Sequence, residues 1–206
     1  MNIQKIAILT SGGDSPGMNA CIRSVVRCAI SQKRNVIGIM RGYEGMIHGE
    51  FVELNARSVS NILQRGGTIL KTARSKAFMT TEGMKKAYDN LCEEGIEGII
   101  AIGGDGTLKG AVAFNKFNNI PFIGIPGTID NDLFGTDYTI GFDTALNTII
   151  DAVDKIKDTA ASHDRLFFVE VMGRDSGCLA LYEGIACGAE EILINKKKTD
   201  INALVE

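Results

Sequence analysis

The 206-residue sequence lacks the patterns of several common kinds of site. It contains no CxxC pair, and its five cysteines lie at scattered, apolar positions, which favours reduced and buried thiols. Only two histidines are present, so we do not expect a histidine-rich zinc site. Neither a Walker A sequence nor a GxGxxG fingerprint occurs, which argues against a standard P-loop or dinucleotide-binding protein.

The sequence also lacks a basic excess and a long apolar run. The formal net charge of -3 argues against a nucleic-acid partner. No apolar run approaches the roughly 18 residues that span a bilayer. Residues 1–9 hold too short an apolar core for a signal peptide. We therefore expect a cytoplasmic protein with no membrane partner.

What is present is a globular composition with alternating strand and helix patterns. The chain is 45% hydrophobic and 23% charged, and is long enough for one large domain or two small ones. Strands are predicted at residues 5–9, 36–40, 98–102 and 122–125. Helices are predicted over 22–30, 58–65 and 82–93 and after a turn at 103–107, with a loop at 41–45. This alternation predicts an α/β fold, a Rossmann-like three-layer sandwich with a parallel sheet.

The pattern changes scale after residue 139. A long helix is predicted at 143–161, then a strand at 166–171, another helix and a strand at 192–194. We therefore expect a first α/β domain at 1–139 and the first part of a second α/β domain at 140–206.

Glycine-rich turns follow three of the predicted strands, at residues 11–17, 103–107 and 126–128. The carboxyl ends of parallel strands meet at one edge of a sheet, which is where ligands bind in such folds. Backbone amides at such turns, next to helix N-termini, form anion sites. Each turn alone fits a tight strand–helix connection equally well, whereas the three together favour phosphate binding.

Three carboxylates in or after the second and third of these turns are candidates for chemistry. Asp105 is a candidate magnesium ligand beside a phosphate, or the N-cap of the next helix. Asp130 and Asp132 are candidates for the base that accepts a hydroxyl proton, or a pair of turn carboxylates. Thr128 either binds a phosphoryl group or caps the turn.

Arginines in predicted loops are candidate phosphate ligands, because a guanidinium binds phosphate oxygens through two hydrogen bonds. Arg74, Arg165 and Arg174 lie in such positions, and Arg174 follows a predicted strand end. From spacing alone, Arg23 and Arg27 fit a solvated helix face.

Four motifs together resemble the 6-phosphofructokinase family. They are TSGGD with PGMN (residues 10–19), GGDGT (103–107), PGTIDND (126–132) and EVMGR (170–174). The resemblance runs from residue 3 to about residue 195. The GGDGT turn alone would also resemble NAD kinases and diacylglycerol kinases.

The resemblance implies a glycolytic enzyme that phosphorylates the 1-hydroxyl of fructose 6-phosphate, with ATP as co-substrate and Mg²⁺ as cofactor. It assigns catalysis to Asp130, Thr128, Arg174 and Asp132. It assigns the nucleotide to Gly13, Arg74, Ser75, Gly104, Asp105, Gly106 and Thr107, with the metal on Asp105. It assigns the sugar phosphate to Thr128, Ile129, Asp130, Arg165, Met172, Gly173 and Arg174. Arg165 is expected to reach a substrate in the neighbouring subunit of a homotetramer.

Gly106 and Gly127 bear on the phosphoryl donor. Pyrophosphate-dependent relatives typically carry Asp and Lys at these two positions, whereas small residues leave room for a nucleotide. We therefore expect ATP as the donor, with pyrophosphate as the alternative.

The resemblance also implies an effector site for ADP or phosphoenolpyruvate. It assigns this site to Arg23, Arg27, Arg57, Lys157, Gly188 and Glu190. Lys157 stands where an arginine is common and Asn61 where an aspartate is common, and a lysine lacks the bidentate fork.

Family members continue well past residue 206, so we expect an N-terminal portion that folds poorly or is inactive alone. The alternative to an enzyme is a non-catalytic nucleotide-sensing module. The presence of Asp105, Thr128, Asp130 and Arg174 argues against that alternative, because a retired site is expected to lose at least one of them.

Overall fold

A computed structural model of the chain describes residues 3–163 and 165–195. The chain divides into two compact units, Met1–Thr128 and Ile129–Glu206. The sequence pattern places the boundary after residue 139, whereas in the structure the segment 129–139 groups with the second unit. Within the described ranges, no helix combines the length and the apolar character needed to cross a bilayer.

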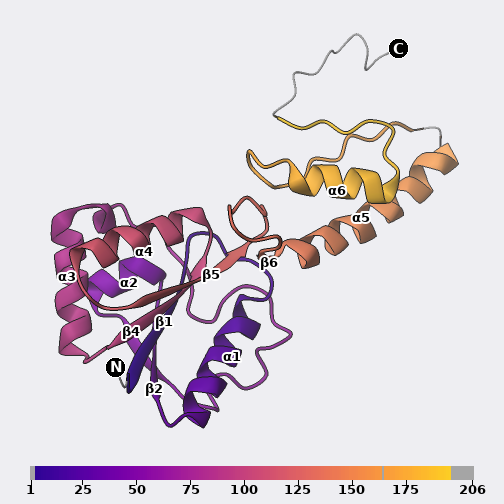
Figure 1. Cartoon of the computed structure of the whole chain (residues 1–206). Helices are drawn as coiled ribbons and strands as arrows, with labels where there is room; N and C mark the ends of the chain where they lie inside the picture. Colours follow the sequence, from indigo (N-terminus) through magenta and orange to yellow (C-terminus); the bar gives the residue numbers. More distant parts are fainter. Residues whose placement is uncertain (1–2, 164, 196–206) are drawn as a thin grey trace. The chain divides into compact units, whose positions relative to one another are not determined.

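The first unit is built on a sheet in which the strands run in the order β3-β2-β1-β4-β5 (Figure 1). The strands are β1 (Lys5–Ser11), β2 (Asn35–Ile39), β3 (Phe51–Leu54), β4 (Gly98–Gly103) and β5 (Phe122–Thr128). Parallel pairing joins β1 to β2 and to β4, and β4 to β5. The four predicted strands are confirmed. The unpredicted β3 runs antiparallel to β2.

Helices cover both faces of this sheet, which confirms the three-layer α/β fold (Figure 1). They are α1 (Met18–Ser31), α2 (Gly42–His48), a 3₁₀ helix η1 (Ala77–Met79), α3 (Thr81–Glu93) and α4 (Asp105–Phe117). On one face, α1 buries Ile22 and Val26. On the other, α2, α3 and α4 bury Met46, Leu91 and Phe114. Burial of each such side chain stabilises the folded state by about 1.5–3 kcal/mol.

The second unit is built around two helices that lie side by side, α5 and α6 (Figure 1). Its elements are β6 (Ile140–Gly141), α5 (Phe142–His163) and α6 (Cys178–Cys187). The ring of Phe142 meets the ring of Tyr182 edge to face, with centroids 5.6 Å apart. Lys157 of α5 donates a hydrogen bond from Nζ to the carbonyl of Cys187. Both predicted helices of this part of the chain are confirmed.

Two predictions in the first unit are wrong. Residues 58–65 form turns instead of a helix, because Asn61 takes a left-handed backbone (φ 55°). The predicted loop at 41–45 instead begins helix α2. Its glycines, which indicated a loop, allow close packing: a Cβ atom on Gly45 would lie 1.7 Å from the carbonyl oxygen of Met40.

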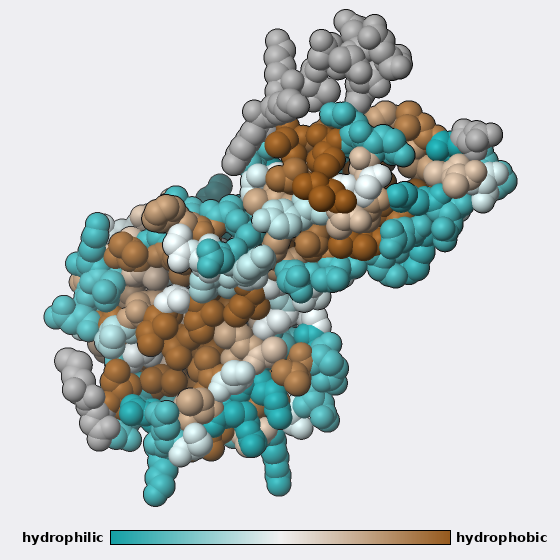
Figure 2. Space-filling view, turned by 45° about the vertical axis from the view of Figure 1, so that its right-hand side comes forward, coloured by the Kyte–Doolittle hydropathy of each residue, from teal (hydrophilic) through white to brown (hydrophobic). Residues whose placement is uncertain are grey.

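Two predicted strands of the second unit are also absent. Residues 166–171 and 192–194 are irregular, and no strand of the described chain pairs with them. Leu166, Phe168 and Leu193 are exposed. Hydrophobic side chains are accordingly visible on the surfaces of both units (Figure 2). An apolar run becomes a strand only when another strand completes its hydrogen bonds.

Candidate active site

The carboxyl ends of β1, β4 and β5 lie in register at one edge of the first unit's sheet. Ser11 at the end of β1 pairs with Gly103 at the end of β4, and Gly103 pairs with Pro126 near the end of β5. The three glycine turns therefore meet where the sequence predicts. The second half of PGTIDND is a loop as expected, but β5 continues to Thr128.

Thr107, at the start of α4, fixes the turn after β4 to the turn after β1. Its Oγ1 donates a hydrogen bond of 3.0 Å to the carbonyl oxygen of Ser11. Its own carbonyl accepts a 2.6 Å hydrogen bond from the buried hydroxyl of Tyr43. A Cβ atom on Gly103 would lie only 2.4 Å from Thr107 Oγ1, so this approach requires glycine. Hydrogen bonds to Ser11 and Tyr43 thus fix the position of the GGDGT turn.

The start of α4 presents backbone to open space. Its N-cap is Gly104, which has no side chain to occupy the first amide groups of the helix. A Cβ atom on Gly13 or on Gly106 would meet no atom within 4 Å. Open space over a helix N-terminus is what a phosphate group requires. The predicted nucleotide residues Gly13, Gly104, Gly106 and Thr107 therefore lie on one sheet edge, in a geometry that fits an anion.

Asp105 is the first residue of α4 and is not its N-cap, so the N-cap alternative is wrong. Its half-exposed carboxylate forms an ion pair of 2.7 Å with Nζ of Lys109. This carboxylate raises the pKa of Lys109. In the described residues, no group of three or more His, Cys, Asp or Glu side chains is placed to hold a metal. A single carboxylate still fits Mg²⁺ that takes its remaining ligands from phosphates and water.

The segment 68–75 lies against the turn after β1. Thr72 Oγ1 donates a hydrogen bond to the carbonyl of Gly12, and Thr10 Oγ1 donates one of 2.9 Å to the carbonyl of Lys71. This segment contains Arg74, whose side chain is exposed. Ser75 has a structural contact, since its Oγ accepts a 3.1 Å hydrogen bond from the amide of Phe78.

Thr128 and Gly127 face different surroundings at the end of β5. A Cβ atom on Gly104 would lie 3.6 Å from Cβ of Thr128, which places Thr128 beside the glycine turn at residues 103–107. A Cβ atom on Gly127 would instead lie 2.9 Å from Cγ2 of the buried Ile102. Packing against Ile102 therefore favours glycine at position 127 whatever the ligand, a constraint that the sequence did not reveal.

In the second unit, Asp130 and Arg174 come together. Asp130 is 9% exposed, and its Oδ2 lies 3.7 Å from Nε of the exposed Arg174. Burial and the neighbouring charge of Asp132 raise the pKa of Asp130, whereas Arg174 lowers it. Asp132 is exposed. The two candidate carboxylates are therefore distinguished: Asp130 is a buried carboxylate beside an arginine, whereas Asp132 is exposed to solvent.

The turn that carries Arg174 is held by side chains on either side. Gly173 and Arg174 both have positive φ, 133° and 47°. Ser176 Oγ donates a 2.9 Å hydrogen bond to the carbonyl of Gly173. Asn195 Nδ2 donates one of 3.1 Å to the carbonyl of Arg174. Sequence reasoning missed both supporting residues.

The remaining predicted substrate residues, Ile129, Met172 and Arg165, also lie in the second unit. Ile129 is half-buried, and Met172 is exposed. The side chain of Arg165 is exposed, while its amide donates a hydrogen bond of 3.2 Å to the carbonyl of Ala160 at the end of α5.

The six predicted effector residues fall into one group in each unit. In the first unit, Arg23 Nη1 donates a 2.6 Å hydrogen bond to the carbonyl of Val59, while Arg27 and Arg57 are exposed. This bond gives Arg23 a structural contact, contrary to the solvated face that spacing suggested. In the second unit, a Cβ atom on Gly188 would lie 3.9 Å from Nζ of Lys157, and Glu190 is exposed.

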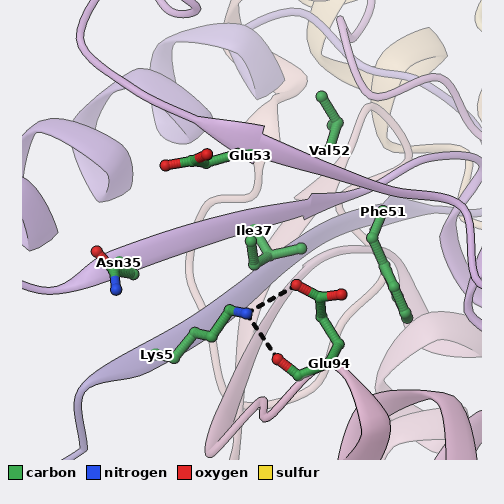
Figure 3. A pocket seen from close by; sticks show the side chains of 7 residues that line it. All are labelled: Lys5, Asn35, Ile37, Phe51, Val52, Glu53 and Glu94. Atoms are coloured by element: carbon green, nitrogen blue, oxygen red, sulfur yellow. Dashed lines mark hydrogen bonds and ion pairs between the residues drawn. The ribbon is translucent and has the colours of Figure 1, made fainter.

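A cavity of about 300 Å³ lies away from these turns (Figure 3). Its lining consists of Lys5, Asn35, Ile37, Phe51, Val52, Glu53 and Glu94. Lys5 and Asn35 are the first residues of β1 and β2, and no residue of the three glycine turns lines the cavity. Lys5 Nζ is already occupied by a 2.7 Å ion pair with Glu94. This cavity is separate from the candidate site.

Comparisons with known proteins agree with the motifs. The profile of the phosphofructokinase family matches residues 5–206. ATP-dependent 6-phosphofructokinase 2 of Bacteroides thetaiotaomicron is 60% identical over 204 residues, or 99% of this chain and 63% of the relative. ATP-dependent 6-phosphofructokinase 1 of Thermus thermophilus is 58% identical over the same coverage. This chain thus spans about 63% of the length of these relatives.

Solved structures agree as well. Phosphofructokinase of Saccharomyces cerevisiae superposes with a TM-score of 0.89 at 43% identity, covering 93% of this chain and 29% of the yeast chain. A pyrophosphate-dependent phosphofructokinase of Marinobacter aquaeolei superposes with a TM-score of 0.84, covering 98% of this chain and 56% of that chain. Its identity is 21%, so it supports the fold alone. By its motifs, its fold and these matches, the chain belongs to the phosphofructokinase family.

Proposed function

We propose that this chain is the nucleotide-binding and catalytic part of an ATP-dependent 6-phosphofructokinase. The reaction transfers the γ-phosphoryl group of ATP to the 1-hydroxyl of fructose 6-phosphate and yields fructose 1,6-bisphosphate and ADP. One observation carries the proposal: the buried carboxylate of Asp130 lies 3.7 Å from the guanidinium of Arg174. Phosphoryl transfer to an alcohol needs a carboxylate for the hydroxyl proton and a cation for the transferring charge.

Asp130 is the general base in this proposal. Its carboxylate accepts the proton of the 1-hydroxyl, a contribution of about 10²–10⁴ in rate. Burial raises its pKa, which makes it a stronger base than an exposed aspartate. Arg174 stabilises the charge on the phosphoryl oxygens, Thr128 donates a hydrogen bond to them, and Asp132 assists.

The first unit supplies the ATP site. The backbone at residues 104–107 and at Gly13 receives the phosphates, with Arg74 as the counter-charge and Ser75 beside it. The open space over Gly13 and Gly106 supports this assignment. Asp105 holds Mg²⁺, which neutralises phosphate charge when bound. Its ion pair with Lys109 is exposed and exchangeable, so it does not oppose this role.

The second unit supplies the sugar-phosphate site. Ile129, Met172 and Gly173 line it beside Asp130 and Arg174. Arg165 reaches the substrate of a neighbouring subunit in a homotetramer, and the exposure of its side chain is compatible with that role. The cytoplasmic location stays a prediction from sequence.

ATP is the proposed donor. A Cβ atom on Gly106 meets nothing within 4 Å, which leaves room for the nucleotide beyond its terminal phosphates. Gly127 supports the choice less, since a side chain there would first meet Ile102. The Bacteroides and Thermus relatives are both named as ATP-dependent enzymes.

ADP and phosphoenolpyruvate are the proposed effectors, and each unit carries three of the residues assigned to them. Arg23, Arg27 and Arg57 belong to the first unit, and Lys157, Gly188 and Glu190 to the second. Lys157 already donates a hydrogen bond to the carbonyl of Cys187, so effector binding has to compete with that contact.

The variant Asp130→Ala tests the function in the protein expressed at its full natural length. We expect turnover with ATP to fall by about 10³-fold, with ATP binding unchanged, because only the base is lost. Asp137→Ala is the matched control, an exposed acid in the same loop, and should keep full turnover. Wild-type turnover with pyrophosphate alone would refute the donor. Wild-type ATP binding without turnover would favour a nucleotide-sensing module.

A further inference from the structure

Asn131 separates the two candidate carboxylates and has a left-handed backbone, with φ 47°. Asparagine tolerates this conformation better than most residues other than glycine. The chain changes direction here: Asp130 before it is buried, whereas Asp132 after it is exposed. The backbone of residue 131 thus determines which carboxylate faces inward.

The side chain of Asn131 ties the start of its loop to the loop's end. Its Nδ2 donates a 3.1 Å hydrogen bond to the carbonyl of Asp137. Its Oδ1 accepts hydrogen bonds of 3.0 Å from the amide and 3.3 Å from Oγ1 of Thr139, a buried residue. We call these three bonds the 131–139 clamp. The clamp uses both ends of the amide, one as donor and one as acceptor, which an ionised carboxylate cannot do because it only accepts.

We propose that Asn131 is a positioning residue, whose clamp holds the Asp130 carboxylate buried and 3.7 Å from Arg174. The inference rests on the proposed function, in which Asp130 is the base. A base must keep its lone pairs available to the substrate hydroxyl, so its orientation is best fixed by a neighbour. A neutral amide does this without adding a third negative charge beside Asp130 and Asp132.

A clamp of this kind predicts a loss in kcat with little change in substrate binding. A base misplaced by about 1 Å costs on the order of 10²-fold in rate. Asn131→Ala, which removes the amide and disfavours the left-handed backbone, should therefore lower kcat by about 10²-fold while KM for both substrates stays nearly constant. Asn131→Gly keeps the backbone and loses only the amide, so it should lower kcat by an intermediate factor.

Asn118→Ala is the matched control. Asn118 also bridges backbone groups with its amide, since Nδ2 donates a 2.7 Å hydrogen bond to Phe114 and Oδ1 accepts one of 2.8 Å from Ile120. It follows α4, at the opposite end of this helix from the GGDGT turn, and belongs to the first unit. A merely structural role for Asn131 predicts that both alanine variants lose stability equally and keep kcat. That result would overturn the inference.

Hydrogen exchange at the amide of Thr139 tests whether the clamp forms, without any turnover assay. The clamp predicts that this amide loses protection in Asn131→Ala and Asn131→Gly and keeps it in Asn118→Ala. Unchanged protection in the two Asn131 variants would overturn the inference, even if the enzyme is active. A wild-type protein with no phosphoryl transfer would refute the proposed function instead, and exchange would still decide the clamp.

Discussion

A single methyl group added at Gly103 should destabilise the protein. Its Cβ atom would lie 2.4 Å from Thr107 Oγ1 and 2.6 Å from the carbonyl oxygen of Ser11. Both contacts are far shorter than the van der Waals distance. The second is with a backbone oxygen that accepts the hydrogen bond from Thr107. Relieving such overpacking costs about 1–3 kcal/mol. Loss of the buried Thr107–Ser11 hydrogen bond adds about 1 kcal/mol.

The same methyl group at Gly106 should have the opposite outcome. Its Cβ atom would meet nothing within 4 Å, and Gly106 lies in the first turn of α4. Alanine there is neutral or stabilises the helix by up to about 1 kcal/mol. The methyl would, however, occupy the space proposed for the phosphates. We therefore expect Gly106→Ala to raise the KM for ATP without lowering the melting temperature.

Thermal unfolding followed by circular dichroism separates these effects. A cost of about 2–4 kcal/mol should lower the melting temperature of Gly103→Ala by about 5–15 °C. Gly106→Ala should melt at the wild-type temperature or up to about 4 °C above it. Equal stability of Gly103→Ala and the wild type would refute the packing argument. An unchanged KM for ATP in Gly106→Ala would refute the phosphate-binding role of the turn.

Two further predictions follow from the titrating groups. In the proposed mechanism turnover needs Asp130 ionised, so activity should be lost as pH falls through its pKa. Asp132→Asn should move this acid limb of kcat to lower pH, whereas Arg174→Gln should move it to higher pH, since the two charges act in opposite directions. Burial raises the pKa of Glu183 in α6, so its ionisation opposes folding above its ordinary pKa. Glu183→Gln should therefore raise the melting temperature at pH 7 and have little effect in acid.

Each of these has a clear contrary outcome. Shifts of the acid limb in the same direction for both charge variants would show that Asp130 is not the titrating base. A Glu183→Gln gain in stability that is the same at pH 3 and pH 7 would arise from packing instead of from ionisation. The hydrogen bond between Glu183 and Cys187 can persist in the glutamine variant, so it does not confuse this comparison.

The sequence predicts the sheet of the first unit well because buried parallel strands leave a strong local signal. Continuous apolar runs such as Ile6-Ala7-Ile8-Leu9 cannot serve as an exposed helix face, and the glycine turns mark their ends. The register of Ser11 with Gly103 follows from parallel topology once the strand ends are known. The location of nearly all the residues assigned to ATP at one sheet edge can therefore be predicted without knowing any tertiary contact.

The errors arise where structure depends on distant partners. Glycines in 41–45 indicate a loop, yet Gly42 and Gly45 instead allow α2 to approach the ends of β1 and β2. The apolar run at 166–171 has the composition of a strand, but strand formation depends on pairing that no local pattern records. The roles of Tyr43 and Asn131 are invisible for the same reason: each acts through one hydrogen-bond geometry set by the fold.

Gly106 and Gly127 illustrate how far a residue type can decide specificity. Sequence reasoning treated both as small residues that leave room for a nucleotide. In the structure, only the Cβ direction of Gly106 is open, whereas that of Gly127 points at Ile102 within the core. A glycine required by packing would be kept whatever the donor. The proposed preference for ATP over pyrophosphate therefore rests, among the residues of this chain, chiefly on the open space at Gly106.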